Sequence, residues 1–118
     1  MVVEDDASRR KTIYDALKDL KIGIVSVANG QEALSRIPSE KPALIIVNMY
    51  SEAVKGADFV RGLRIYGMGQ LIHILGIVEN VDVDAKAAQL AGVNKAIGAK
   101  LDVEQLSKIV NEQLAKKN

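Results

Sequence analysis

The segment Leu44-Ile45-Ile46-Val47-Asn48 joins four apolar residues to a terminal amide, and Gly56 follows eight positions after that amide. A short run that is apolar on both faces is typical of a parallel strand enclosed between two layers of helices. Pro42 stands just before the run, where a missing backbone donor costs little. The segment therefore predicts a central strand of an α/β domain.

Four further apolar runs alternate with stretches that carry apolar residues at helical spacing. The runs span Met1 to Val3, Ile24 to Val27, Leu71 to Val78 and Ala96 to Ile97. The helical sets are Ile13, Leu17 and Leu20; Ala33, Leu34 and Ile37; Val60 and Leu63; Ala87, Leu90 and Ala91; and Leu106, Ile109, Val110 and Leu114. This alternation predicts five parallel strands connected by helices.

Residues with a capping role mark three of the expected helix ends. Asn29-Gly30 provides a turn and cap before the second helix, and Gly92 stands where a left-handed cap would close the fourth. Asp102 and Gln105 have the spacing of a variant capping box at the start of the fifth helix.

Length and composition restrict the class of protein. The 118 residues suit a single domain, and a net charge of +1 provides no overall field toward nucleic acid or an anionic membrane. The absence of cysteine excludes disulfides and thiolate metal sites, and the single histidine, His73, makes a histidine-built zinc site improbable. No apolar run reaches the roughly 18 to 20 residues that span a bilayer, and no signal peptide is recognisable. We expect one soluble, cytoplasmic domain over residues 1–118, and the abrupt start at Met1 suggests that it was excised from a longer protein.

Four motifs, in order along the chain, point to one family. They are Val2-Val3-Glu4-Asp5-Asp6-Ala7-Ser8, Ala28-Asn29-Gly30-Gln31-Glu32-Ala33-Leu34, Leu44 to Asn48 with Gly56, and Ala91-Gly92-Val93. With these motifs the chain resembles, over essentially its whole length, the receiver domain of two-component response regulators of the chemotaxis type. The resemblance implies a flavodoxin-like three-layer sandwich whose five parallel strands have the order 2-1-3-4-5.

The resemblance also implies a phosphorylation chemistry, from which this chain departs. In the family an aspartate at the end of strand three takes a phosphoryl group, assisted by carboxylate-bound Mg²⁺, a strand-four hydroxyl and a strand-five lysine. The acceptor position here is Asn48, a neutral amide that is a poor nucleophile and a poor Mg²⁺ ligand. The hydroxyl position is Ile77, or Val78 if the register shifts by one, and Val78 is also expected to narrow the site.

Two receiver positions near the fifth strand carry small residues. The lysine position corresponds to Ala99, and Lys100 comes one residue late, so it would point to the opposite face unless the backbone is irregular. The aromatic switch position corresponds to Ala96. We therefore expect a degenerate phosphorylation pocket made of Glu4, Asp5, Asn48, Ile77, Val78, Ala99 and Lys100.

Several polar residues allow a structural interpretation as well as a functional one. Glu4-Asp5-Asp6 could be a solvated acidic turn that favours the start of a helix, or Glu4 and Asp5 could hold Mg²⁺ weakly. We expect no bound cofactor and little stabilisation by Mg²⁺. Asn48 is expected to cap nearby backbone. The stretch Ser8-Arg9-Arg10-Lys11 has the Ser-x-x-Lys spacing of some acyl enzymes but lacks the companion motifs, so we interpret it as an exposed basic helix start.

These features favour a phosphorylation-independent pseudo-receiver in two-component signalling, which is not an enzyme and which binds other signalling proteins or a second copy of itself. Neither nucleic acid nor membrane is expected as a direct partner. The expected surface comprises helices four and five and the edge strand, with Lys100, Glu104, Lys108 and Glu112. An alternative is a conditional phosphoacceptor that uses Asp5 or Glu52. A flavodoxin-like ligand binder is disfavoured, since three Tyr, one Phe and no Trp offer little to enclose a flavin ring.

Overall fold

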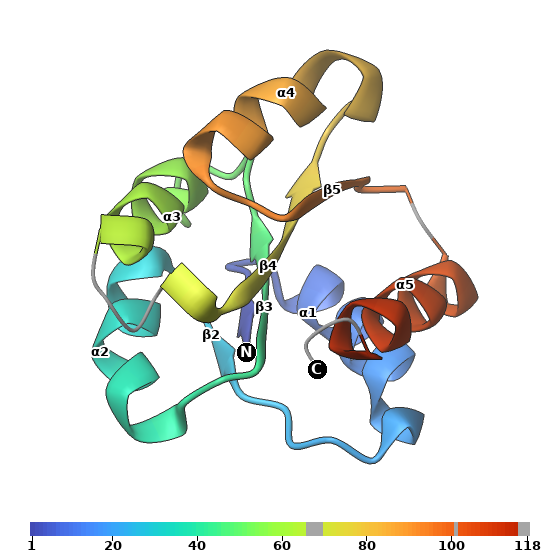
Figure 1. Ribbon diagram of the computed structural model, residues 1–118. Coiled ribbons are helices and arrows are strands. Elements are labelled where there is room, and N and C mark those ends of the chain that lie inside the picture. The colour runs from blue at the N-terminus through green and yellow to red at the C-terminus, as the bar shows by residue number, and fades with distance from the viewer. Residues whose placement is uncertain (66–69, 101, 116–118) are drawn as a thin grey trace.

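The structure, a computed structural model, describes residues 1–65, 70–100 and 102–115. One sheet of five parallel strands has the order β2-β1-β3-β4-β5 (Figure 1). The strands are β1 (Val2–Val3), β2 (Ser26–Val27), β3 (Leu44–Asn48), β4 (His73–Val78) and β5 (Lys95–Gly98). The expected α/β class, the parallel sheet and its strand order are confirmed.

The helices occupy the segments between the strands. They are α1 (Ala7–Leu17), which continues as a short 3₁₀ turn (Lys18–Leu20), α2 (Gly30–Glu40), α3 (Gly56–Ile65), α4 (Val81–Ala91) and α5 (Val103–Ala115). In the described part of the chain, no helix has both the length and the apolar character needed to cross a membrane.

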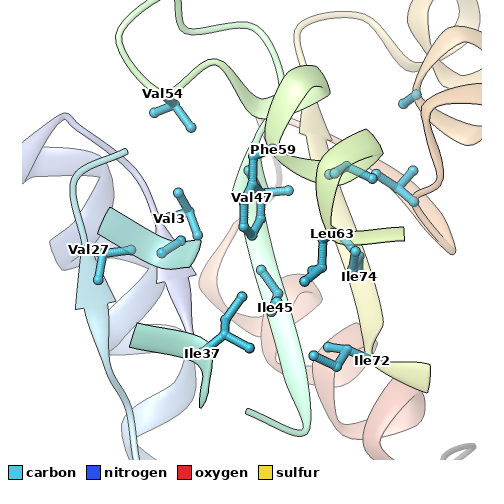
Figure 2. Packing of buried hydrophobic residues seen from close by; sticks show 14 of the residues in the cluster. Val3, Val27, Ile37, Ile45, Val47, Val54, Phe59, Leu63, Ile72 and Ile74 are labelled. Carbon is cyan, nitrogen blue, oxygen red and sulfur yellow. The ribbon is translucent and has the colours of Figure 1, made fainter. Parts of the chain in front are cut away.

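The helices form a layer on each face of the sheet. Helices α1 and α5 pack together on one face, and α2, α3 and α4 cover the other (Figure 1). Side chains of β3 alternate between the two cores: Ile45 and Val47 belong to the core that includes α2 and α3, and Ile46 to the core that includes α1 and α5. Figure 2 shows the first core, where Phe59 of α3 packs with apolar side chains of the strands, among them Val47 and Ile45.

All three expected caps are confirmed. Asn29 Oδ1 accepts from the Glu32 amide at 2.9 Å and so caps α2. Asp102 Oδ1 accepts from the Gln105 amide at 2.8 Å, and the Asp102 amide donates to Gln105 Oε1 at 3.3 Å. Gly92 closes α4 at φ +125°, a backbone angle that favours glycine.

Three sequence expectations need correction. The second strand is shorter than Ile24 to Val27, because only Ser26 and Val27 pair with β1 as a strand, although the Val25 carbonyl accepts from the Val2 amide at 2.7 Å. The fourth strand begins at His73, and Leu71, at the start of the expected run, is 85% exposed. The apolar set expected in α4 is correct only for Ala91, which is buried together with Ala88, whereas Ala87 is exposed and Leu90 is 80% exposed. A short alanine-rich helix carries several sets with helical spacing, and only packing selects the one that faces the core.

The register of the central strands brings polar residues together at the carboxyl edge of the sheet. Val3 of β1 pairs with Val47 of β3, so Glu4 and Asn48 come next at the same level. Asn48 in turn pairs with Ile77 of β4. The residues that follow β1, β3 and β4 therefore meet at the edge where open α/β sheets place their functional groups.

Candidate functional site

The centre of this edge is an ordered group that we call the β1–β3 cluster: Glu4, Asp5, Arg9, Asn48 and Ser51. Glu4 and Asn48 are almost fully inaccessible, with exposures of 1% and 0%. Asn48 Nδ2 donates to Oε1 and to Oε2 of Glu4, at 3.0 Å in each case. The amide therefore supplies donors to a buried carboxylate, which would otherwise be costly to bury.

The oxygen of Asn48 organises the loop that follows β3. Asn48 Oδ1 accepts from the backbone amides of Tyr50 and Ser51, at 2.9 Å each. A carbonyl oxygen has two lone pairs, so its accepting capacity is filled. The expectation that Asn48 caps nearby backbone is confirmed. The amide orientation is set by the nitrogen donating to Glu4 and the oxygen accepting from the two backbone amides.

Arg9 provides the positive charge of the cluster. Its Nε lies 2.8 Å from Glu4 Oε1, and its guanidinium carbon lies 5.6 Å from the centre of the Tyr50 ring. The hydrogen bond to Glu4 raises the pKa of Arg9 above its ordinary value. The interpretation of residues 8–11 as only an exposed basic helix start is therefore wrong for Arg9. Its position one helical turn beyond the acidic residues was the available signal.

The acidic residues after β1 have three different roles. Asp6 caps α1, because its Oδ1 accepts from the Arg9 amide at 2.9 Å. Asp5 is exposed, and its Oδ1 accepts from the Ser51 hydroxyl at 2.8 Å, which lowers the pKa of Asp5. The solvated-turn interpretation thus holds for Asp5 and Asp6, and it is wrong for Glu4, which is buried and paired.

Gly56 allows α3 to begin against the end of β3. A Cβ atom at this position would lie 2.5 Å from the carbonyl oxygen of Asn48 and 3.0 Å from Met49 Cα. Both neighbours are backbone atoms that cannot move independently of the cluster. The glycine of the sequence motif therefore has a steric reason to be present.

The strand-four positions are apolar and buried. Ile77 lies beside Asn48 in the register and joins the core under α1 and α5, at 7% exposure. Val78 belongs to the core on the opposite face, at 3% exposure. Val78 also lines a hollow next to the cluster, together with Met49, Tyr50, Glu79, Asp84, Ala87 and Ala88.

Of the fifth-strand positions, Ala96 lies within β5, and Ala99 and Lys100 follow its end. Ala96 is half-buried against the α2–α3 core, at the switch position expected from the resemblance. The Ala99 amide donates to the Val78 carbonyl at 2.9 Å, and Ala99 and Lys100 form an exposed turn. The backbone at Lys100 is thus irregular, which was the condition under which Lys100 could point toward the site.

The remaining predicted residues lie away from the cluster or at its margin. Glu104, Lys108 and Glu112 are exposed along α5, as expected for a surface. Glu52 is exposed in the loop between β3 and α3. Among the described residues, no group of three or more histidine, aspartate or glutamate side chains is arranged to hold a metal ion.

Comparison with known proteins identifies the family. The model of the response regulator receiver domain matches residues 1–111, which is nearly the whole chain. The chain belongs to the response regulator receiver domain family. A curated relative from Porphyridium aerugineum, named "Probable transcriptional regulator ycf27", is 30% identical over 64 residues, which are 54% of this chain and 27% of that protein. The matched stretch covers about a quarter of the length of this relative.

Solved receiver structures have the same fold. The chemotaxis response regulator CheY4 of Vibrio cholerae superposes with a TM-score of 0.85 at 21% identity, over 95% of this chain and 94% of that one. The receiver domain of the sensor histidine kinase PA1611 from Pseudomonas aeruginosa, solved with magnesium coordinated in its active-site cleft, gives 0.85 at 20% identity, over 97% and 94%. NtrX from Brucella abortus gives 0.87 at 16% identity, over 98% of this chain and 26% of NtrX.

Proposed function

We propose that this receiver domain transmits a signal through protein contacts without aspartyl phosphorylation, as one module of a longer signalling protein. The observation that supports this proposal best is the state of Asn48. Its nitrogen donates to Glu4, and its oxygen accepts from the Tyr50 and Ser51 amides. An amide so engaged has no free lone pair to attack phosphorus, and its nitrogen lone pair is delocalised.

The two positions at which a receiver places its hydroxyl and its ammonium also lack a donor side chain here. The transferring group carries negative charge on its equatorial oxygens, which receivers and other phosphotransfer proteins neutralise with fixed donors and cations. The neighbouring strand presents Ile77, and the lysine position holds Ala99. Neither side chain can donate a hydrogen bond, so a repaired acceptor would still lack support.

The cluster is a poor fit for the magnesium ion that PA1611 holds in its cleft. Mg²⁺ prefers anionic oxygen and several organised ligands. Here both Glu4 oxygens accept from Asn48, and Oε1 also accepts from Arg9. Asp5 Oδ1 accepts from Ser51. Because these oxygens already have donors, Mg²⁺ should have little effect on stability.

The proposed contact surface comprises the outer faces of α4 and α5 and the edge strand β5, together with the turn that follows it. Lys100, Glu104, Lys108 and Glu112 give it mixed charge. Val83 and Leu90 of α4 add large apolar side chains, exposed at 73% and 80%. Their spacing places them on one side of the helix, which suits a protein partner, either another signalling protein or a second copy of the chain.

Incubation with acetyl phosphate and Mg²⁺, followed by intact-mass measurement, tests the absence of phosphorylation. We expect an unmodified mass under conditions that label an ordinary receiver treated in parallel. If the mass rises by one phosphoryl group, mapping the acyl phosphate would identify its carboxylate. Modification of Asp5 or Glu52 would replace this proposal with a conditional phosphoacceptor.

Sedimentation equilibrium of the purified chain tests the contact surface. Should the chain self-associate, charge reversal at Lys108 and Glu112 is expected to weaken the association. Lys11→Glu on the exposed part of α1 is the matched control, because it also reverses a charge and lies on another helix. An association that survives the α5 changes and is lost with Lys11→Glu would place the surface on α1 instead.

A further inference from the structure

The guanidinium of Arg9 lies against a run of three consecutive acidic residues. Glu4, Asp5 and Asp6 follow one another at the end of β1, and Asn48 adds no charge. In the described part of the chain, Arg9 is the one cationic side chain that pairs with the Glu4 carboxylate. The side chain of Arg9 is 43% exposed and that of Glu4 only 1%, so the arginine covers the acid from the solvent side.

We propose that the Arg9 side chain is a counter-ion that competes with divalent cations for the Glu4 carboxylate. Arg9 would then supply the positive charge that a metal ion supplies in the pocket of an ordinary receiver. This inference rests on the proposed function, because it concerns the same site, and it deepens that proposal by naming what closes the site to metal. It assigns the exclusion of metal ions to the Arg9 side chain, because the Asn48 amide alone would not exclude them.

The hydrogen bonds of Glu4 show which partner a metal would have to displace. Oε1 accepts from Asn48 Nδ2 and from Arg9 Nε, whereas Oε2 accepts from Asn48 Nδ2 and, at 3.4 Å, from the Asp6 amide. The Asp6 amide belongs to the backbone, and Asn48 is buried. Arg9 is therefore the partner that can leave, since its side chain is partly exposed.

Arg9 is also well placed to compete. Its own amide donates to Asp6 Oδ1 at 2.9 Å, which anchors its backbone at the start of α1. Its guanidinium lies 5.6 Å from the centre of the Tyr50 ring, within the range of a cation–π contact. A cation tethered in this way has a high effective concentration at Glu4, and its charge repels a second cation.

The test compares Mn²⁺ affinities in an Asn48→Asp background, which provides a third carboxylate. Arg9→Met removes the charge while keeping an unbranched apolar stem beside Tyr50. Arg10→Met is the matched control, because Arg10 Nη1 donates to the backbone oxygen of Glu4, at 3.2 Å, and not to its carboxylate. Mn²⁺ binding is measured by water-proton relaxation, with circular dichroism as the check of folding.

We expect the Asn48→Asp, Arg9→Met protein to bind Mn²⁺ about tenfold or more tightly than Asn48→Asp alone, since a like charge a few ångströms from the ion is removed. Arg10→Met in the same background should change the affinity by less than about twofold. Equal affinities with and without Arg9, or the same gain from Arg10→Met, would overturn the inference. If Arg9→Met fails to fold, Arg9→Gln replaces it and the same comparison decides.

An Arg9→Lys variant in the Asn48→Asp background completes the design. It retains the charge and should bind Mn²⁺ as weakly as Asn48→Asp alone; a gain equal to that of Arg9→Met would also count against competition by charge. The wild-type mass after acetyl phosphate treatment decides the proposed function, whereas the ratio of Mn²⁺ affinities decides this inference. The two can therefore fail independently.

Discussion

The side-chain nitrogen of Asn48 donates to both carboxylate oxygens of Glu4, at 3.0 Å each, although 44 positions separate the two residues in the chain. The contact joins the ends of β1 and β3 at the edge of the sheet where receivers carry their chemistry. A donor at this position stabilises a buried negative charge, whereas the aspartate of an ordinary receiver would add a second one.

Asn48→Asp should therefore lower stability. The retained Oδ1 can still accept from the Tyr50 and Ser51 amides, and the new oxygen replaces the nitrogen that donates to Glu4, so the substitution isolates the contact with Glu4. We expect the free energy of unfolding at neutral pH to fall by about 2–4 kcal/mol, because a buried charge loses its donor. Urea denaturation measures the change, with the exposed Asn111→Asp as control. A loss no greater than that of the control would contradict the role assigned to Asn48.

Repair of the phosphorylation chemistry should require several changes at once. Asn48→Asp alone restores a nucleophile. Ile77→Thr adds the hydroxyl, Val78→Ala gives a phosphodonor access to the pocket, and Ala99→Lys adds the ammonium. Fixed donors of this kind contribute about 3–4 kcal/mol each in other enzymes. The sequence predicts that the fourfold variant responds to beryllofluoride, and the Arg9 pair with Glu4 is expected to weaken this response.

Heteronuclear NMR titration with beryllofluoride and Mg²⁺ distinguishes these variants. Wild type and the single variant should not respond, and addition of Arg9→Met to the fourfold variant should strengthen its response. A wild-type chain that responds at Asn48 and Asp5 would show that the pocket is functional as it stands.

Ser51→Ala should raise the pKa of Asp5. The Ser51 hydroxyl donates to Asp5 Oδ1 and is the main cause of the lowered pKa, so its loss moves the pKa back toward the ordinary value of 3.8. Because the folded pKa is the lower one, Asp5 contributes stability above pH 3.8, and this contribution disappears as the pH falls through the folded pKa. An NMR titration of the carboxyl carbon measures the shift, and an unchanged pKa would remove Ser51 as its cause.

Gly56→Ala and Gly62→Ala should have opposite effects although both lie in α3. At Gly56 a Cβ would come 2.5 Å from the Asn48 carbonyl oxygen, whereas at Gly62 it would meet nothing within 4 Å. We expect a loss of about 1–3 kcal/mol for the first from overpacking. The second should gain about 0.5–1 kcal/mol from helix propensity. Thermal denaturation measures both, and equal effects would exclude the steric explanation.

Arg64→Ala should destabilise the end of the sheet opposite the cluster. Arg64 donates to the carbonyls of Gly92 and Ile72 at 2.9 and 2.7 Å, and to Asn94 Oδ1 at 2.7 Å. These bonds tie α3 to the lead-in of β4 and to the α4–β5 turn, and their loss leaves partly buried carbonyls without this donor. We expect the free energy of unfolding to fall by about 2–4 kcal/mol.

The control for this prediction is Arg61→Ala in the same helix. Arg61 is exposed and has a single 3.7 Å ion pair with Asp58, so its loss should cost less than about 0.5 kcal/mol. Hydrogen exchange should show faster opening of the α4–β5 turn for Arg64→Ala than for Arg61→Ala. Similar exchange in the two variants would mean that the Arg64 contacts contribute little.

Local patterns determined most of the fold. The strand Leu44–Asn48, the caps at Asn29 and Asp102, and Gly92 at the end of α4 were all predictable, because each depends on neighbours within a few residues. The apolar spacing in the sequence could not predict which face of α4 is buried, because that depends on what packs against the helix. Leu90, which the spacing assigned to the core, is exposed.

The sequence by itself determined the α/β sheet, the neutral Asn48 after the third strand, and the apolar residues at positions 77 and 99. Only the tertiary structure decided which charged groups meet there. The register of β1 and β3 places Asn48 beside Glu4, and the first turn of α1 places Arg9 Nε 2.8 Å from Glu4 Oε1. The Asn48–Glu4 contact depends on the relative positions of two separate strands, and the Arg9–Glu4 pair depends on side-chain rotamers; neither leaves a periodic signal in the chain.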